Sequence, residues 1–158
     1  MSGFADDVEA LKLRLESDGE SGIESALRNC DDVHVITGVL KMYFRLLPIP
    51  LITFDSYPYF MSAVKKVTDY EKTNAMREAI GMLPPAHYQT ARFFFNHLVK
   101  VAANSNENLM TAYNLSTVFS PTLMKTPNIS LMPFQANAWQ VEAEVLEFVI
   151  THYSKLFK

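Results

Sequence analysis

The chain has 158 residues, of which 49% are hydrophobic and 20% charged, a composition typical of one globular domain rather than a disordered chain. Its formal net charge of −3 and its pI near 5.8 argue against a nucleic-acid binder, which usually carries a basic stripe. No apolar run approaches the roughly 20 residues that span a bilayer, and no signal segment is visible, so we expect a cytoplasmic protein without a membrane segment.

The spacing of apolar residues predicts helices along almost the whole chain. Val8, Leu11 and Leu15 recur at helical spacing and indicate a first helix. Gly19 and Gly22 follow it, and we expect these glycines to end that segment.

A second helix is predicted after Asp31 or Asp32, either of which can cap its first turn. Its apolar face is formed by residues at regular helical spacing, namely Ile36, Leu40, Tyr43 and Leu47. Pro48 and Pro50 end the helix because neither ring nitrogen donates a hydrogen bond and each proline disfavours helix in the residue before it.

Five further helices are predicted over about 53–67, 69–82, 88–102, 109–119 and 139–157. A polar break at about 104–108 and a proline-containing loop at about 120–134 separate the later ones. The aromatic run Phe93-Phe94-Phe95 is predicted to lie in the core. No alternating strand pattern and no internal repeat is present, so the sequence predicts an all-α fold with one domain over residues 1–158.

The usual enzymatic motifs are missing from the sequence. There is no G-x-x-x-x-G-K-[ST] loop and no G-x-S-x-G turn. The histidines show no H-x-x-x-H spacing, and Cys30 is the single cysteine, which we expect to be structural or incidental. We therefore expect no metal site, no cofactor and no catalytic pocket of the chain's own.

Two short stretches instead suggest a surface that binds another protein. Lys41 and Arg45 lie one helical turn apart and about 130 to 170° from the predicted apolar face, so both are expected to point outward. A solvated face is the usual explanation of such a pair, but an acidic partner would offset the mutual repulsion of the two cations. Asn114 is predicted to bury an amide in an apolar helix, as a cap, a satisfied core amide or part of a binding site.

These stretches together resemble the GTPase-activating (RhoGAP) domain of Rho-family regulators. The first is Leu40-Lys41…Phe44-Arg45-x-Leu47-Pro48-x-Pro50-Leu51-Ile52, and the second, some sixty residues later, is Asn114-Leu115…Val118-Phe119-x-Pro121-x-Leu123. Leu83-Pro84-Pro85-Ala86-His87-Tyr88, Asn108-Leu109-Met110 and the opening Ser2-Gly3-Phe4 are similar to the chimaerin branch of that family. The resemblance covers essentially the whole chain.

The resemblance implies a helical domain that docks on the switch regions of a GTP-loaded Rho- or Rac-family small GTPase. Lys41 and Arg45 would then shape the GTPase-contacting groove, and Asn114 would lie near the switch regions and help to order the catalytic loop. Pro121 would be an edge contact, and the turn at 48–50, with Pro48 and Pro50, would shape the chain beside the groove.

Two departures from the family pattern matter. Ser120 stands where the family usually has glycine, so we expect a strained or redirected loop there. Family members also carry a catalytic arginine finger just before the stretch that matches Met1-Ser2-Gly3, so we expect a domain truncated at its N-terminus, without the family's first helices and without any catalytic residue. Arg14 and Arg28 are no obvious substitutes.

Because an arginine finger is worth about 10³ to 10⁵ in rate, we expect weak GTPase activation from this sequence. The alternatives are a non-catalytic module that binds the switch regions, or a truncated fragment.

Overall fold

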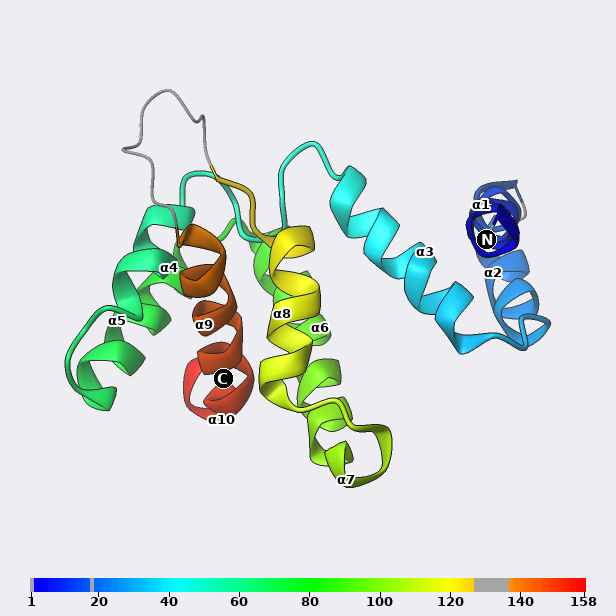
Figure 1. Cartoon of the computed structure of the whole chain (residues 1–158). Helices are drawn as coiled ribbons and strands as arrows, with labels where there is room; N and C mark the ends of the chain where they lie inside the picture. Colours follow the sequence, from blue (N-terminus) through cyan, green and yellow to red (C-terminus); the bar gives the residue numbers. More distant parts are fainter. Residues whose placement is uncertain (1, 18, 127–136) are drawn as a thin grey trace. The chain divides into compact units, whose positions relative to one another are not determined.

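A computed structural model describes residues 2–17, 19–126 and 137–158 of the chain. Every regular element in these ranges is a helix, so the all-α prediction is confirmed (Figure 1). The chain forms two compact units, Met1–Leu46 (unit 1) and Leu47–Lys158 (unit 2), and each is described by itself.

The described residues of unit 1 form three helices, α1 (Ser2–Ser17), α2 (Gly19–Arg28) and α3 (Val33–Leu46). α1 packs against both of the others. The buried core residues are Val8, Leu11, Ala26 and Val35, and the half-buried Leu15, Cys30, Ile36, Val39 and Met42 pack against them. Cys30 therefore contributes to the packing of this small core.

The helix α2 was missed from the sequence. Gly19 adopts a φ of 66°, which only glycine reaches without a steric cost, and this residue turns the chain from α1 into α2. Gly22 lies inside α2, so the expectation that both glycines end the helical segment was wrong. The apolar pattern of α2 extends over too few residues to indicate a helix beside two glycines.

The face by which α3 packs on α1 also differs from the predicted one. Gly38 lets α3 approach α1 closely. A Cβ atom added at this position would lie only 2.9 Å from Cγ2 of Val8, so a larger residue would not fit without a shift. The packed residues therefore include Val39 and Met42, whereas Tyr43 of the predicted face is 58% exposed.

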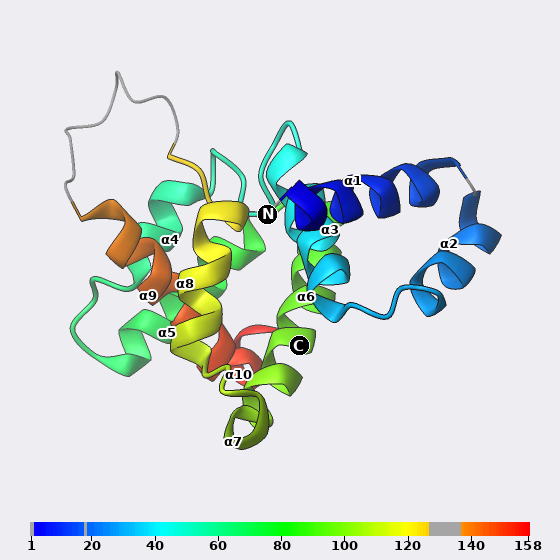
Figure 2. The same cartoon turned by 45° about the vertical axis from the view of Figure 1, so that its right-hand side comes forward.

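Unit 2 contains seven helices within its described residues, namely α4 (Tyr57–Ala63), α5 (Asp69–Gly81), α6 (Pro85–Ala103), α7 (Ser105–Asn108), α8 (Ala112–Leu123), α9 (Ala138–Thr151) and α10 (Tyr153–Leu156). α9 lies at the centre of the bundle and packs against α8, α6 and α4 (Figures 1 and 2). Val145 and Leu146 of α9 are completely buried. Burial of apolar side chains such as these stabilises the unit.

Two helix starts follow from local sequence signals. Thr68 and Glu71 form a capping box at the start of α5, in which each side chain accepts from the other residue's backbone amide. Pro85 begins α6, where its missing amide hydrogen costs nothing. The predicted helix over 69–82 therefore agrees with α5 to within one residue.

Three other segments depart from prediction. The helix expected over 53–67 is shortened to α4, because Thr53 and Ser56 bond to each other in a turn before it, with 2.9 Å between their hydroxyl oxygens. The helix expected over 139–157 is divided at His152, whose ring Nδ1 lies 3.1 Å from the carbonyl oxygen of Phe148. Phe93 is 81% exposed, so only Phe94 and Phe95 of the aromatic run belong to the core.

Candidate partner-binding surface

The two cations of the first motif lie on α3 in unit 1. Lys41 is half-buried and Arg45 is exposed, one helical turn further on. At 100° per residue they project about 160° and 120° from Val39, which packs against α1. Lys41 therefore points away from the face that α1 covers, whereas Arg45 projects only about 20° from Gly38, the residue of closest approach to α1, two helical turns further along α3.

The proline turn of the first motif belongs to unit 2. Pro48 is exposed and Pro50 is buried. Just after them, the amide of Ile52 donates to the carbonyl of Leu123 over 3.1 Å. The proline turn is thereby fixed beside the C-terminal end of α8, where Pro121 lies.

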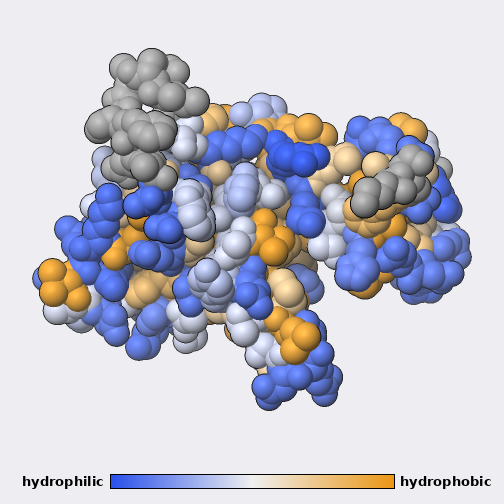
Figure 3. All heavy atoms as spheres, in the orientation of Figure 1, coloured by the Kyte–Doolittle hydropathy of each residue, from blue (hydrophilic) through white to orange (hydrophobic). Residues whose placement is uncertain are grey.

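The second motif forms α8, which contains no charged residue. Its inner residues are buried against the bundle, including Leu115, Ser116, Phe119 and Ser120. Its outer side forms a continuous exposed surface of Asn114, Thr117, Val118 and Pro121, called the α8 stripe below. Over α8 the surface is mostly pale in Figure 3, between the hydrophobic and hydrophilic extremes of the scale.

Asn114 is exposed, so the expectation that it buries its amide was wrong. Thr111 caps α8 by accepting from the backbone amide of Asn114 at 3.1 Å. The Asn114 side chain instead donates from Nδ2 to the carbonyl oxygen of Leu109 over 2.9 Å. The apolar surroundings in the sequence suggested burial, but the helix places Asn114 on its outer side.

Pro121 lies inside α8, whereas a loop was predicted from residue 120 onward. The helix continues because Leu123 is completely buried and the amide of Met124 donates to the carbonyl of Ser120 over 3.0 Å. Since proline has no amide hydrogen, the carbonyl of Thr117, four residues earlier, loses its usual helical donor.

Ser120 is helical and 3% exposed, and among the described residues the non-glycine positive φ occurs at Leu109 instead. The expected strain at Ser120 was therefore wrong. Its side chain is part of the packed inner face of α8.

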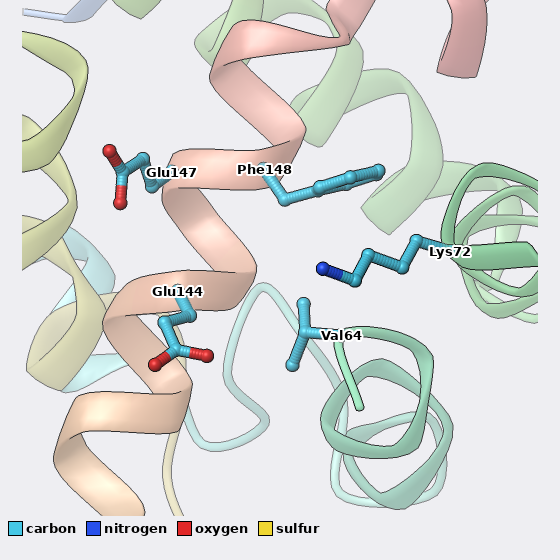
Figure 4. A pocket seen from close by; sticks show the side chains of 5 residues that line it. All are labelled: Val64, Lys72, Glu144, Glu147 and Phe148. Atoms are coloured by element: carbon cyan, nitrogen blue, oxygen red, sulfur yellow. The ribbon is translucent and has the colours of Figure 1, made fainter. Parts of the chain in front are cut away.

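A shallow hollow on another side of unit 2 has a volume of about 190 Å³. It is lined by Val64, Lys72, Glu144, Glu147 and Phe148 (Figure 4). The Lys72 ammonium reaches in toward α9, with the Phe148 ring above it, while the Glu147 carboxylate points to the opposite side of α9. This volume is below the roughly 300 Å³ of small ligand pockets, so the hollow does not suit an organic substrate.

One buried polar pair lies between α4 and α9. The Tyr57 hydroxyl donates to Oε1 of Glu142 over 2.6 Å, and the two residues are 1% and 8% exposed. Burial raises the pKa of Glu142, and burial together with the Glu142 hydrogen bond raises the pKa of Tyr57 to about 12. The pair links two helices far apart in the sequence and is enclosed by the core, so we assign it a structural role.

No cluster of three or more histidine, cysteine, aspartate or glutamate side chains suited to a metal ion occurs among residues 2–17, 19–126 and 137–158. Within the same ranges no helix is both long and apolar enough to cross a membrane.

Comparisons with known proteins identify the fold. Residues 1–128 match the family described as "RhoGAP domain". Human N-chimaerin is 41% identical over 157 residues, which cover 99% of this chain and 34% of that protein. Rat beta-chimaerin is 46% identical over 132 residues, which cover 84% of this chain and 44% of that protein. The chain thus spans about a third to a half of the length of these relatives.

Solved structures agree. Human Rho GTPase activating protein 15 superposes with a TM-score of 0.80 and 29% identity, over 98% of this chain and 71% of that one. The BH domain of GRAF, a GTPase regulator associated with focal adhesion kinase, gives a TM-score of 0.78 and 29% identity, over 96% of this chain and 78% of that one. With its family match over most of the chain and its relatives at more than 40% identity, the chain belongs to the RhoGAP domain family.

Proposed function

We propose that residues 1–158 act as one GTPase-activating module that binds GTP-loaded Rho- or Rac-family small GTPases in the cytoplasm. The observation that carries this proposal is the α8 stripe, an exposed helix face without a charged side chain. Exposed helix faces usually carry charges, and charged residues are depleted at the centre of protein interfaces. The matching family and the chimaerin relatives give the class of partner.

The residues of both motifs take part in the proposed binding. Lys41 and Arg45 supply positive charge on α3, which suits an acidic partner surface. Asn114 contacts the GTPase near its switch regions through the amide atoms that do not bond to Leu109, and Pro121 contacts it at the other end of the α8 stripe. The turn at 48–50 shapes the chain beside α8.

Residues 1–158 alone contribute less to catalysis than a module with an arginine finger. The family resemblance implies a finger position before the stretch that matches Met1-Ser2-Gly3, and such a cation is worth about 10³ to 10⁵ in rate. Docking alone accelerates hydrolysis slightly, because it orders the glutamine that positions the attacking water in the GTPase.

Binding is tested with purified Rac- and Rho-family GTPases loaded with GDP or with a non-hydrolysable GTP analogue. We expect preferential binding to the GTP form, and we expect Thr117→Arg to weaken it at least tenfold because the new cation lies in the middle of the α8 stripe. The matched control is Gln89→Arg, at an exposed position on α6, which should bind normally. Equal binding by both variants, or no binding of any GTPase, would refute the proposal.

A further inference from the structure

Leu109 has an unusual backbone conformation for its side chain. Its φ of 62° and ψ of 13° lie in the left-handed region, which residues with a Cβ rarely adopt. The side chain is also 74% exposed, so no burial in the described structure compensates for this conformation. A glycine or an asparagine would fit here at a lower steric cost.

Several hydrogen bonds hold the backbone at this corner between α7 and α8. Asn108 donates from Nδ2 to the carbonyl of Val101 and accepts on Oδ1 from the amide of Met110, each over 2.8 Å. The Leu109 amide donates to the carbonyl of Ser105 over 2.9 Å, and its carbonyl accepts from Asn114. Strain that is over-determined in this way and serves no packing points to function.

The corner continues the α8 stripe. The carbonyl of Leu109 bonds directly to the side chain of Asn114, the first residue of the stripe. Tyr113, next to Asn114, is 59% exposed, so large apolar side chains stand at this end of the uncharged surface. In Figure 3 hydrophobic atoms lie between the hydrophilic tip at α7 and the pale surface over α8.

We propose that Leu109 is an apolar contact for the bound GTPase, held at the Asn114 end of the α8 stripe by its left-handed backbone. This inference rests on the proposed function and adds a binding residue outside the two sequence motifs. The partner surface that suits it is an apolar or aromatic side chain beside the switch regions, because an exposed leucine gains affinity only by leaving water.

The test measures the affinity of three variants for a GTPase loaded with a non-hydrolysable GTP analogue. Leu109→Asn keeps a residue that tolerates the left-handed region but removes the apolar side chain, and we expect about tenfold weaker binding with an unchanged or higher melting temperature. Leu109→Met keeps an apolar side chain and should bind within about threefold of the unmodified chain. Val67→Asn is the matched control, since Val67 is 91% exposed at the turn between α4 and α5, and it should bind normally.

Unchanged binding by Leu109→Asn, when the unmodified chain binds and Thr117→Arg does not, would overturn this inference and leave the proposed function intact. Equal weakening by Leu109→Asn and Val67→Asn would also overturn it, because the effect would then be general to exposed apolar residues. If Leu109→Asn loses helicity, the inference stands or falls on Leu109→Met and on Leu109→Gly, which removes the side chain where glycine fits best. Failure of the unmodified chain to bind any GTPase would overturn the proposed function and this inference together.

Discussion

The replacement Tyr57→Phe removes one hydroxyl from the buried pair between α4 and α9 and should destabilise unit 2 considerably. The lost hydrogen bond is 2.6 Å long and ends on a carboxyl that is only 8% exposed. Because the carboxyl keeps its burial and loses a donor, the cost should be about 2 kcal/mol, the range for hydrogen bonds to charged groups. For a domain of about 100 residues this corresponds to a melting temperature lower by about 8 °C.

The effect should also depend on pH. Burial raises the pKa of Glu142 above its ordinary value of 4.5, so the folded state holds this proton more tightly than the unfolded state. The stabilisation is complete below pH 4.5 and is lost as the pH rises through the raised pKa. Because the Tyr57 hydrogen bond lowers the pKa of Glu142, its removal should raise that pKa further and make the variant's loss of stability larger at pH 8 than at pH 5.

Urea denaturation followed by far-UV circular dichroism, at pH 5 and pH 8, measures both quantities. Glu142→Gln serves as the control, since it keeps an acceptor for Tyr57 and removes the titrating carboxyl, and it should abolish this part of the pH dependence. A loss below about 0.5 kcal/mol for Tyr57→Phe at both pH values would refute the reasoning, because such a value is typical of a surface substitution.

Three further outcomes are expected. Ser120→Gly should lower the free energy of unfolding by about 1 kcal/mol in thermal melts, because residue 120 is helical, and a stability gain would restore the strained-loop hypothesis. Gly38→Val should cost about 1 to 3 kcal/mol, since even a Cβ would lie 2.9 Å from Val8, and an unchanged melt would contradict the close packing of α3 on α1. Lys41→Glu should weaken GTPase binding at least tenfold at low salt with helicity unchanged. The control Lys100→Glu, at an exposed position on α6, should bind normally, and equal binding by both variants would assign Lys41 to a solvated face.

Where local signals are strong, the sequence predicted the helices correctly. The capping box of Thr68 and Glu71 determines the start of α5 without help from the rest of the fold. The end of α8 could not be predicted in this way. A proline at 121 normally ends a helix, but the burial of Leu123 and its carbonyl bond to the Ile52 amide keep these residues helical.

The candidate site shows the same difference. Lys41, Arg45 and Asn114 were assigned to it from the resemblance to a family pattern, and that assignment stays a prediction. The role of the Asn114 side chain could not be read from the sequence, since it depends on the left-handed backbone of Leu109 five residues earlier. The sequence signal at this corner was Asn108-Leu109, an asparagine followed by an apolar residue. This pair does not distinguish a turn from the first residues of a helix.

Single-turnover GTP hydrolysis by Rho- and Rac-family GTPases tests the central claim most directly. Residues 1–158 alone should accelerate hydrolysis slightly, and an N-terminal extension that ends in arginine directly before Met1 should raise the rate by about 10³-fold or more. The same extension ending in alanine lacks the cation and should stay close to the unextended chain. Two results would contradict this account. The alanine form could equal the arginine form, or neither form could change the hydrolysis rate of any GTPase. In either case residues 1–158 are not a GTPase-activating module whose full activity needs an arginine finger.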